Sequence, residues 1–131
     1  MLDQLAVFNH ESPGYKSQVS FNGWRVAILN SVDKYRRENV SYFDRHMETD
    51  EVFVLLEGKC QLLIAGRGDR PKDTKSVWLV SGLVYNVRQG TWHTQILEEN
   101  TRVLIVENAD TSSKNTEQYH FPQTERIALI P

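Results

Sequence analysis

The chain has 131 residues, the length of one globular domain, and its 15 Lys and Arg against 17 Asp and Glu give a net charge of −2. Proteins that bind nucleic-acid phosphates usually carry a basic excess, so this balance argues against a nucleic-acid partner. The longest apolar run, Val52 to Leu56, is too short to span a bilayer. The N-terminus lacks the basic region of a secretory signal. The single cysteine, Cys60, excludes an internal disulfide. The sequence therefore favours a cytoplasmic protein with one domain over residues 1–131 and no membrane partner.

Short β-like runs separated by turn residues follow one another along the chain. In chain order, these runs are 24–29, 40–43, 51–56, 60–65, 76–80, 83–87, 91–97, 102–106 and 127–130. Glu57-Gly58-Lys59 predicts a tight hairpin between two of them, and 31–38 is the best candidate for a helical turn. Loops are expected over 66–73 and 108–118. Many short strands with regular turns indicate an all-β sandwich or barrel.

The alternation of side chains along a strand assigns the residues to faces. It places three polar side chains, Tyr42, Asp44 and His46, on one face of their strand. It also groups Glu51 with Phe53 and Leu55, and His93 with Thr91, Gln95 and Leu97. The strand at 51–55 is apolar on both faces, which predicts that a second layer or another subunit covers its outer side.

Other polar candidates are assigned to structural roles. We expect His10 and His120 to be exposed, and 34–37, a small basic cluster, to be a solvated turn. Trp92 is predicted to be a core aromatic residue on the face opposite His93. Cys60 is predicted to be a small buried residue.

Two blocks of spaced residues resemble the two motifs of the cupin superfamily. His46, Glu51 and Gly58 match the first motif, in which Asp44 takes the place of the usual first histidine. The second block matches at Gly82, Gly90 and His93, with Arg88 where the family has proline and Leu97 where it has asparagine.

The resemblance implies a double-stranded β-helix (jelly-roll) barrel, usually a homodimer, that holds a divalent metal inside. Carried over, the metal ligands are His46, Glu51 and His93, a facial set that suits Zn, Mn, Ni or Fe. Asp44 is either a fourth ligand or a group that orients His46 or a bound water. The terminal runs near 5–8 and 127–130 are candidates for pairing between subunits.

A narrower resemblance links 86–93, Asn-Val-Arg-Gln-Gly-Thr-Trp-His, to the ureidoglycolate lyases, cupin-type enzymes that split ureidoglycolate into glyoxylate and urea. Arg45-His46 followed by Phe53 is similar as well. The chain departs from these lyases at Thr94, where they tend to have a second histidine, and at Glu51, where they tend to have glutamine.

These observations predict a metal-dependent lyase, hydrolase or isomerase that acts on a small polar carboxylate metabolite. Asp44 or Glu51 is the candidate general base. Arg88 is the candidate partner of a substrate carboxylate, and Tyr42 and Gln95 are candidates for binding substrate from the inner face. Two alternatives stay open at this point: a non-catalytic cupin that binds a small ligand, and an iron-dependent dioxygenase, which uses the same kind of ligand set.

Overall fold

The computed structural model describes residues 3–131, which form ten strands and little helix. The strands are β1 (Gly14–Phe21), β2 (Trp24–Asn30), β3 (Tyr42–His46), β4 (Glu51–Glu57), β5 (Cys60–Ile64), β6 (Lys75–Trp78), β7 (Tyr85–Val87), β8 (His93–Leu97), β9 (Arg102–Asn108) and β10 (Thr116–His120). The helical segments are the 3₁₀ turns η1 (Asp33–Tyr35) and η2 (Gln123–Glu125) and the short helix α1 (Arg126–Leu129). Within the described residues, no helix is long and apolar enough to cross a membrane.

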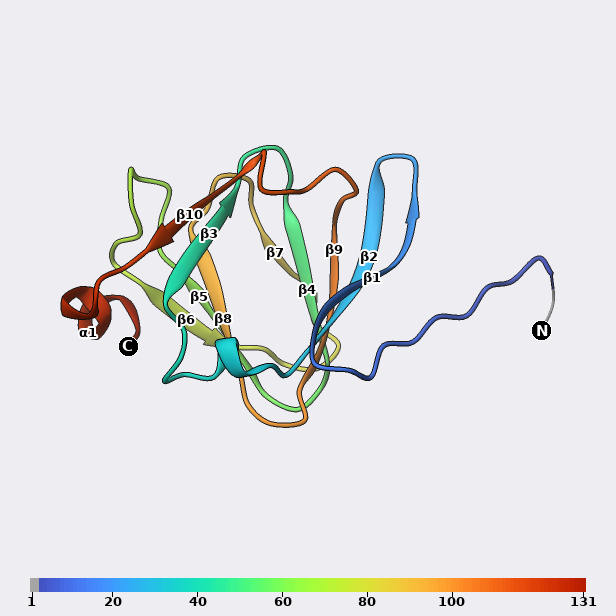
Figure 1. Cartoon of the computed structure of the whole chain (residues 1–131), viewed down its shortest axis with the longest axis horizontal. Helices are drawn as coiled ribbons and strands as arrows, with labels where there is room; N and C mark the ends of the chain where they lie inside the picture. Colours follow the sequence, from blue (N-terminus) through green and yellow to red (C-terminus); the bar gives the residue numbers. More distant parts are fainter. Residues whose placement is uncertain (1–2) are drawn as a thin grey trace.

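The strands form two five-stranded antiparallel sheets that face each other (Figure 1). One has the order β1-β2-β9-β4-β7 and the other β10-β3-β8-β5-β6. The inward side chains of both sheets form the core, in which Leu29, Phe53, Leu63 and Val103 are among the fully buried residues. The predicted all-β class is thus confirmed, as two packed sheets in an arrangement consistent with a jelly roll, and among the described residues no strand pairing joins the two sheets into a closed barrel.

The predicted hairpin at Gly58 is wrong. β4 pairs with β7 and β9, whereas β5 pairs with β6 and β8, so the turn carries the chain from one sheet to the other. A short turn containing glycine is typical of hairpins, but it can also form the tight connection by which the chain crosses from one sheet to the other. Gly58 has φ +82°, and a Cβ at this position would lie 2.6 Å from the Cα of Thr101. The glycine is therefore needed for both its conformation and its close contact.

The C-terminal segment differs from the predicted strand at 127–130. It folds into α1, because Phe121 and Leu129 are buried in the core cluster, and the guanidinium of Arg126 donates to the backbone carbonyl of Val40. Four apolar residues are too few to separate strand from helix by periodicity. The run at 5–8 likewise has no strand; it is extended and exposed.

Several smaller predictions can be compared with the structure. The helical turn at 31–38 contains η1, and Cys60 and Trp92 are buried as expected. His120 is exposed, as predicted, but His10 is buried, and its Nε2 lies 2.9 Å from the carbonyl oxygen of Gly14. The loop predicted at 108–118 is shorter than expected, since β10 begins at Thr116.

Candidate metal centre

Three strands bring the polar side chains of the predicted site together. Tyr42, Asp44 and His46 alternate along β3 and all line one pocket, as the face assignment predicted. β8 lies beside β3 in the same sheet, with Asp44 directly opposite His93 in the register. Glu51, the first residue of β4, comes from the facing sheet.

Two histidines converge on one carboxylate oxygen. Nε2 of His46 lies 3.1 Å from Oε1 of Glu51, and Nε2 of His93 lies 2.9 Å from the same oxygen. One ligand atom from each of the three residues falls within 4.8 Å of the others. The side chains of Glu51 and His93 are almost completely buried, and that of His46 is 12% exposed.

The outer nitrogens of both rings have partners that fix their orientation. Nδ1 of His93 donates to the backbone carbonyl of Thr91 at 2.9 Å, and Nδ1 of His46 lies 2.8 Å from the hydroxyl of Thr116. The carbonyl of Thr91 can only accept, so it keeps the proton of His93 on Nδ1 and leaves Nε2 free. The hydroxyl of Thr116 fixes the orientation of the His46 ring.

The same contacts shift two pKa values in opposite directions. Burial raises the pKa of Glu51, but its hydrogen-bond contacts with His46 and His93 outweigh burial and hold this pKa well below its ordinary value. Burial lowers the pKa of His93, but the hydrogen bond and negative charge of Glu51 outweigh it, so the net pKa is raised. A buried carboxylate that stays ionised beside two imidazoles favours a positive charge at this point.

The residues present fit a divalent metal ion. Because Nδ1 of His93 carries the proton, the neutral ring turns its Nε2 lone pair toward a carboxylate oxygen 2.9 Å away. Two acceptors at this distance need a proton or a cation between them.

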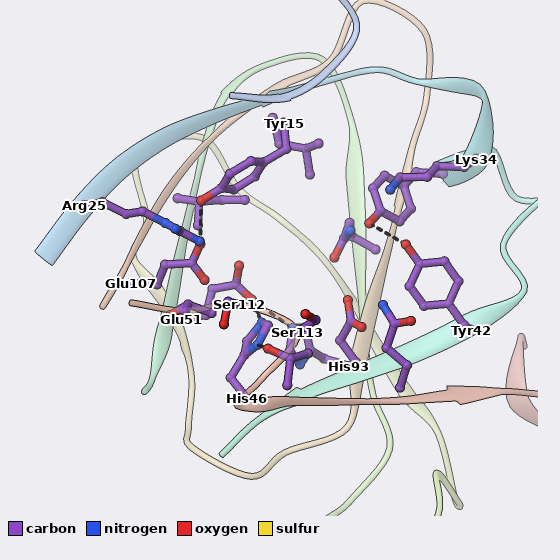
Figure 2. Close-up of a pocket in the computed structure, with 18 residues that line it drawn as sticks. Tyr15, Arg25, Lys34, Tyr42, His46, Glu51, His93, Glu107, Ser112 and Ser113 are labelled. Atoms are coloured by element: carbon purple, nitrogen blue, oxygen red, sulfur yellow. Dashed lines mark hydrogen bonds and ion pairs between the residues drawn. The ribbon is translucent and has the colours of Figure 1, made fainter. Parts of the chain in front are cut away.

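The three ligand candidates lie in a pocket of about 520 Å³ between the two sheets. Figure 2 shows two further polar groups on opposite sides of it. Tyr15, Arg25 and Glu107 lie on one side, and Lys34 and Tyr42 on the other, with the His-Glu-His group between them. The volume is that of a site for a small metabolite.

Comparisons with known proteins identify the architecture. No family model matches the sequence, and no curated protein matches it. Among solved structures, the chain is similar to a cupin-2 domain protein of Shewanella frigidimarina, with 23% identity, a TM-score of 0.50, and coverage of 78% of this chain and 84% of that one. The chain has a cupin fold.

Two enzymes with characterised ligands share this cupin fold. The sugar 3,4-ketoisomerase QdtA of Thermoanaerobacterium thermosaccharolyticum, in complex with TDP, matches with 16% identity and a TM-score of 0.57, over 71% of this chain and 64% of its own. Pac13, a nucleoside dehydratase of Streptomyces, matches with 8% identity and a TM-score of 0.59, over 86% of this chain and 83% of its own. This chain therefore spans slightly less than two thirds of the ketoisomerase. The neighbours show that enzymes use the fold.

The cupin pocket holds most of the residues that the sequence analysis singled out. Tyr42 and Gln95 line it beside the His-Glu-His group, and so does Asp44. Asp44 lies outside the set of three whose ligand atoms converge. Burial raises the pKa of Asp44, partly offset by a hydrogen bond from Gln118 and by the two histidines. Its role as a fourth metal ligand stays a prediction.

Arg88 does not reach the pocket. It follows β7 in an exposed turn and is not among the lining residues. The alternation of side chains that starts from His93 does not continue through the turn at Gln89-Gly90, where Gly90 has φ +77°. The side chain of Arg88 could therefore not be assigned to a face from the sequence. We therefore assign no contact with the substrate to Arg88.

Sequence reasoning missed the polar residues that other elements contribute to the pocket. Arg25 shares the inward face of β2 with Ala27 and Leu29. The alternation of side chains along the predicted strand at 24–29 could therefore have identified Arg25 as an inward residue. Lys34 is exposed, as expected for the cluster at 34–37, and it also lines the pocket. Thr116, the partner of His46, falls in a segment expected to be a loop.

Removing the hydroxyl of Thr116 tests its support of His46. We expect Thr116→Val to weaken metal binding about 10- to 100-fold, the usual effect of losing such a partner, because the imidazole loses the bond that fixes its orientation. Competition titration with a zinc-sensitive dye measures this. Thr111→Val, a threonine that also lines the pocket but bonds to the carbonyl of Asn108, is the control. Equal affinity of Thr116→Val and wild type would contradict the assigned role.

Acidification is expected to release the metal, because protons and metal compete for Nε2 of His93. The ring must be neutral to bind, and its pKa in the metal-free protein lies above the ordinary 6.5. The affinity for the metal is therefore highest at pH values above this raised pKa, where the ring is neutral. It falls as the pH drops through this pKa, by about tenfold per pH unit for each histidine protonated. Glu51, whose pKa is lowered, contributes no loss in this range. Zinc titrations at pH 8, 7 and 6 measure the trend, and a pH-independent affinity would contradict it.

Proposed function

We propose that this protein is a metal-dependent enzyme of the lyase, hydrolase or isomerase type that acts on a small polar carboxylate metabolite. The observation that carries the proposal is the convergence of His46, Glu51 and His93 at 2.9 and 3.1 Å in a pocket of about 520 Å³. In this proposal residues 1–131 act as one cupin domain in the cytoplasm.

The chemistry of the pocket supports this class of reaction. A divalent ion held by His46, Glu51 and His93 would polarise a substrate oxygen and stabilise negative charge that develops on it. Because both histidines contact the carboxylate of Glu51, this residue is assigned to the metal rather than to proton transfer. Asp44, in the same pocket, is then the candidate general base.

The structural neighbours support the reaction type without fixing the substrate. A ketoisomerase and a dehydratase belong to the isomerase and lyase classes, and both share the fold of this chain. The sequence resemblance to ureidoglycolate lyases selects ureidoglycolate as the first substrate to assay. Small hydroxy and keto acids follow, because they combine a carboxylate with an oxygen that a metal can polarise.

A second candidate is an iron-dependent dioxygenase. The specific observation in its favour is the set of two histidines and one carboxylate, a facial arrangement that non-haem iron oxygenases use. Oxygen consumption by the iron-loaded protein in the presence of these acids separates the two candidates. A lyase, hydrolase or isomerase consumes no oxygen.

The decisive experiment is the metal content of the purified, untagged protein by elemental mass spectrometry. We expect near-stoichiometric metal in the wild type and in His120→Ala, and none in His46→Ala. His120 is a suitable control because it is exposed and does not line the pocket. The identity of the metal then selects the assay, and His46→Ala must also abolish turnover.

Two results would overturn the proposal. Absence of metal from the wild type, even after loading with Zn, Mn, Ni or Fe, would show that the His-Glu-His group holds no metal, and would make Asp44 the candidate disabling substitution. Tight binding of an acid without any turnover would make the protein a small-ligand-binding cupin, which is the non-catalytic alternative.

We also propose that the protein is a homodimer. The extended N-terminal segment exposes three apolar side chains, Leu5, Val7 and Phe8, each more than half exposed, and it points away from the body of the molecule (Figure 1). Burying them against a second copy would remove this apolar surface from water. We expect sedimentation velocity to show a dimer that weakens when residues 1–8 are deleted. A strictly monomeric profile for the full chain would contradict this.

A further inference from the structure

Lys34 is a cation at the pocket without a carboxylate partner. Its ammonium nitrogen lies 4.9 Å from the ring centroid of Tyr35 and 6.0 Å from that of Tyr42. Among residues 3–131, no carboxylate lies within 4.0 Å of it. Arg25, the other permanent cation that lines the pocket, is by contrast paired with Glu107 at 3.0 Å. Lys34 is therefore the lining cation that is available to an anionic ligand.

Two tyrosine hydroxyls beside Lys34 provide a further donor. The hydroxyls of Tyr35 and Tyr42 lie 3.2 Å apart, so one donates to the other, and the acceptor keeps a proton of its own. Tyr35 is buried, and burial raises its pKa, which keeps its hydroxyl protonated at neutral pH. An ammonium and a free hydroxyl proton together match the needs of a carboxylate.

Asp44 marks a second position in the same part of the pocket. Its Oδ1 is buried and has no hydrogen-bond partner within the described chain. Such an atom is costly unless something satisfies it. A ligand hydroxyl can do so in either protonation state of Asp44, because a hydroxyl both donates and accepts. Asp44 is two residues from Tyr42 along β3, on the same inward face.

We propose that Lys34, Tyr35, Tyr42 and Asp44 form a subsite for a hydroxycarboxylate, in which the ammonium and a tyrosine hydroxyl bind the carboxylate and Asp44 binds the hydroxyl. The inference rests on the proposed function in that it names the substrate class of the same pocket. The subsite itself requires no metal, so the two can fail separately. It replaces Arg88, which lies outside the pocket, as the partner of the substrate carboxylate.

Calorimetric titration of the metal-free protein with malate and with succinate tests the subsite, because these dicarboxylates differ by one hydroxyl. We expect malate to bind about tenfold more tightly than succinate. Lys34→Met should weaken both by at least about tenfold. Asp44→Ala should remove the difference between them. Lys72→Met, which removes an exposed lysine outside the pocket, should change neither.

The metal ligands provide the discriminating control. We expect His46→Ala to keep binding malate in a manner that depends on Lys34, although it holds no metal. Loss of malate binding in His46→Ala but not in Lys34→Met would place the anion at the histidines and overturn the subsite. Equal affinities for malate and succinate would overturn the role of Asp44, and tighter binding of inorganic phosphate than of malate would overturn the ligand class. Metal retention is measured on the same samples, so a failure of the proposed function is seen independently.

Discussion

Replacing His93 by alanine is expected to abolish metal retention by the purified protein. The imidazole supplies one of the three convergent donors, and its Nε2 lies 2.9 Å from Oε1 of Glu51. The loss of a group that only hydrogen-bonds to a ligand weakens metal sites by up to about 100-fold, and the loss of a ligand itself should exceed this. Elemental mass spectrometry of the variant, after dialysis against metal-free buffer, measures the result.

The fold of His93→Ala should persist, which separates a lost ligand from a lost structure. His93 lies at the pocket, so water can occupy the space that the ring leaves, and Glu51 keeps its contact with His46. The far-ultraviolet circular dichroism spectrum and a cooperative urea transition should therefore match those of the wild type in form. His93→Gln, which retains a polar side chain of similar size, should also lack metal. Full metal occupancy in either variant would contradict the assignment of His93 as a ligand.

Gly58→Ala is expected to destabilise the protein by about 3 kcal/mol. A left-handed conformation costs a non-glycine residue about 1–2 kcal/mol, and forced overpacking costs about 1–3 kcal/mol more. Both apply here, because φ is +82° and the new Cβ would lie 2.6 Å from the Cα of Thr101 and 2.7 Å from the carbonyl oxygen of Asn100. Urea unfolding, monitored by tryptophan fluorescence, measures the change in the free energy of unfolding.

Gly82→Ala is the matched control for this experiment. Gly82 has φ +87°, but a Cβ there would meet nothing within 4 Å, so the variant carries the conformational strain without the close contact. We expect it to lose only about 1–2 kcal/mol. Similar losses in both variants would show that the contact with Thr101 is relieved by a small backbone movement, and that the crossing tolerates a side chain.

The local features of the fold were predictable from the sequence. Strict alternation along 42–46 placed Tyr42, Asp44 and His46 on one inward face, and the structure confirms this. The resemblance to the two cupin motifs likewise implied that His46, Glu51 and His93 converge, and the structure brings them together. The first prediction depends on the period of a strand, which the sequence contains directly, and the second depends on the match to the motifs of a family.

The pairing of strands could not be predicted in the same way. The turn at Gly58 has the composition of a hairpin, but whether β4 and β5 share a sheet depends on the other strands that compete to pair with them. The same holds for Lys34 and Arg25. Their charge is evident in the sequence, but their orientation toward one pocket depends on how η1 and β2 pack against the rest of the chain.

The crossing at Gly58 also has a consequence for how fast this protein folds. Because the chain changes sheets there, β4 pairs with a strand that is distant in sequence, β9, and Val52 lies opposite Val106. The other neighbour of β9 is also distant, since Trp24 of β2 pairs with Asn108. Each such pairing must close a long loop before it gains any contact, and proteins dominated by contacts of this kind fold in milliseconds to seconds. The His-Glu-His group joins strands from both sheets, so it assembles late, once both are in place. A newly made chain is therefore expected to complete the proposed metal site only in the last steps of folding, after the strands of both sheets have paired.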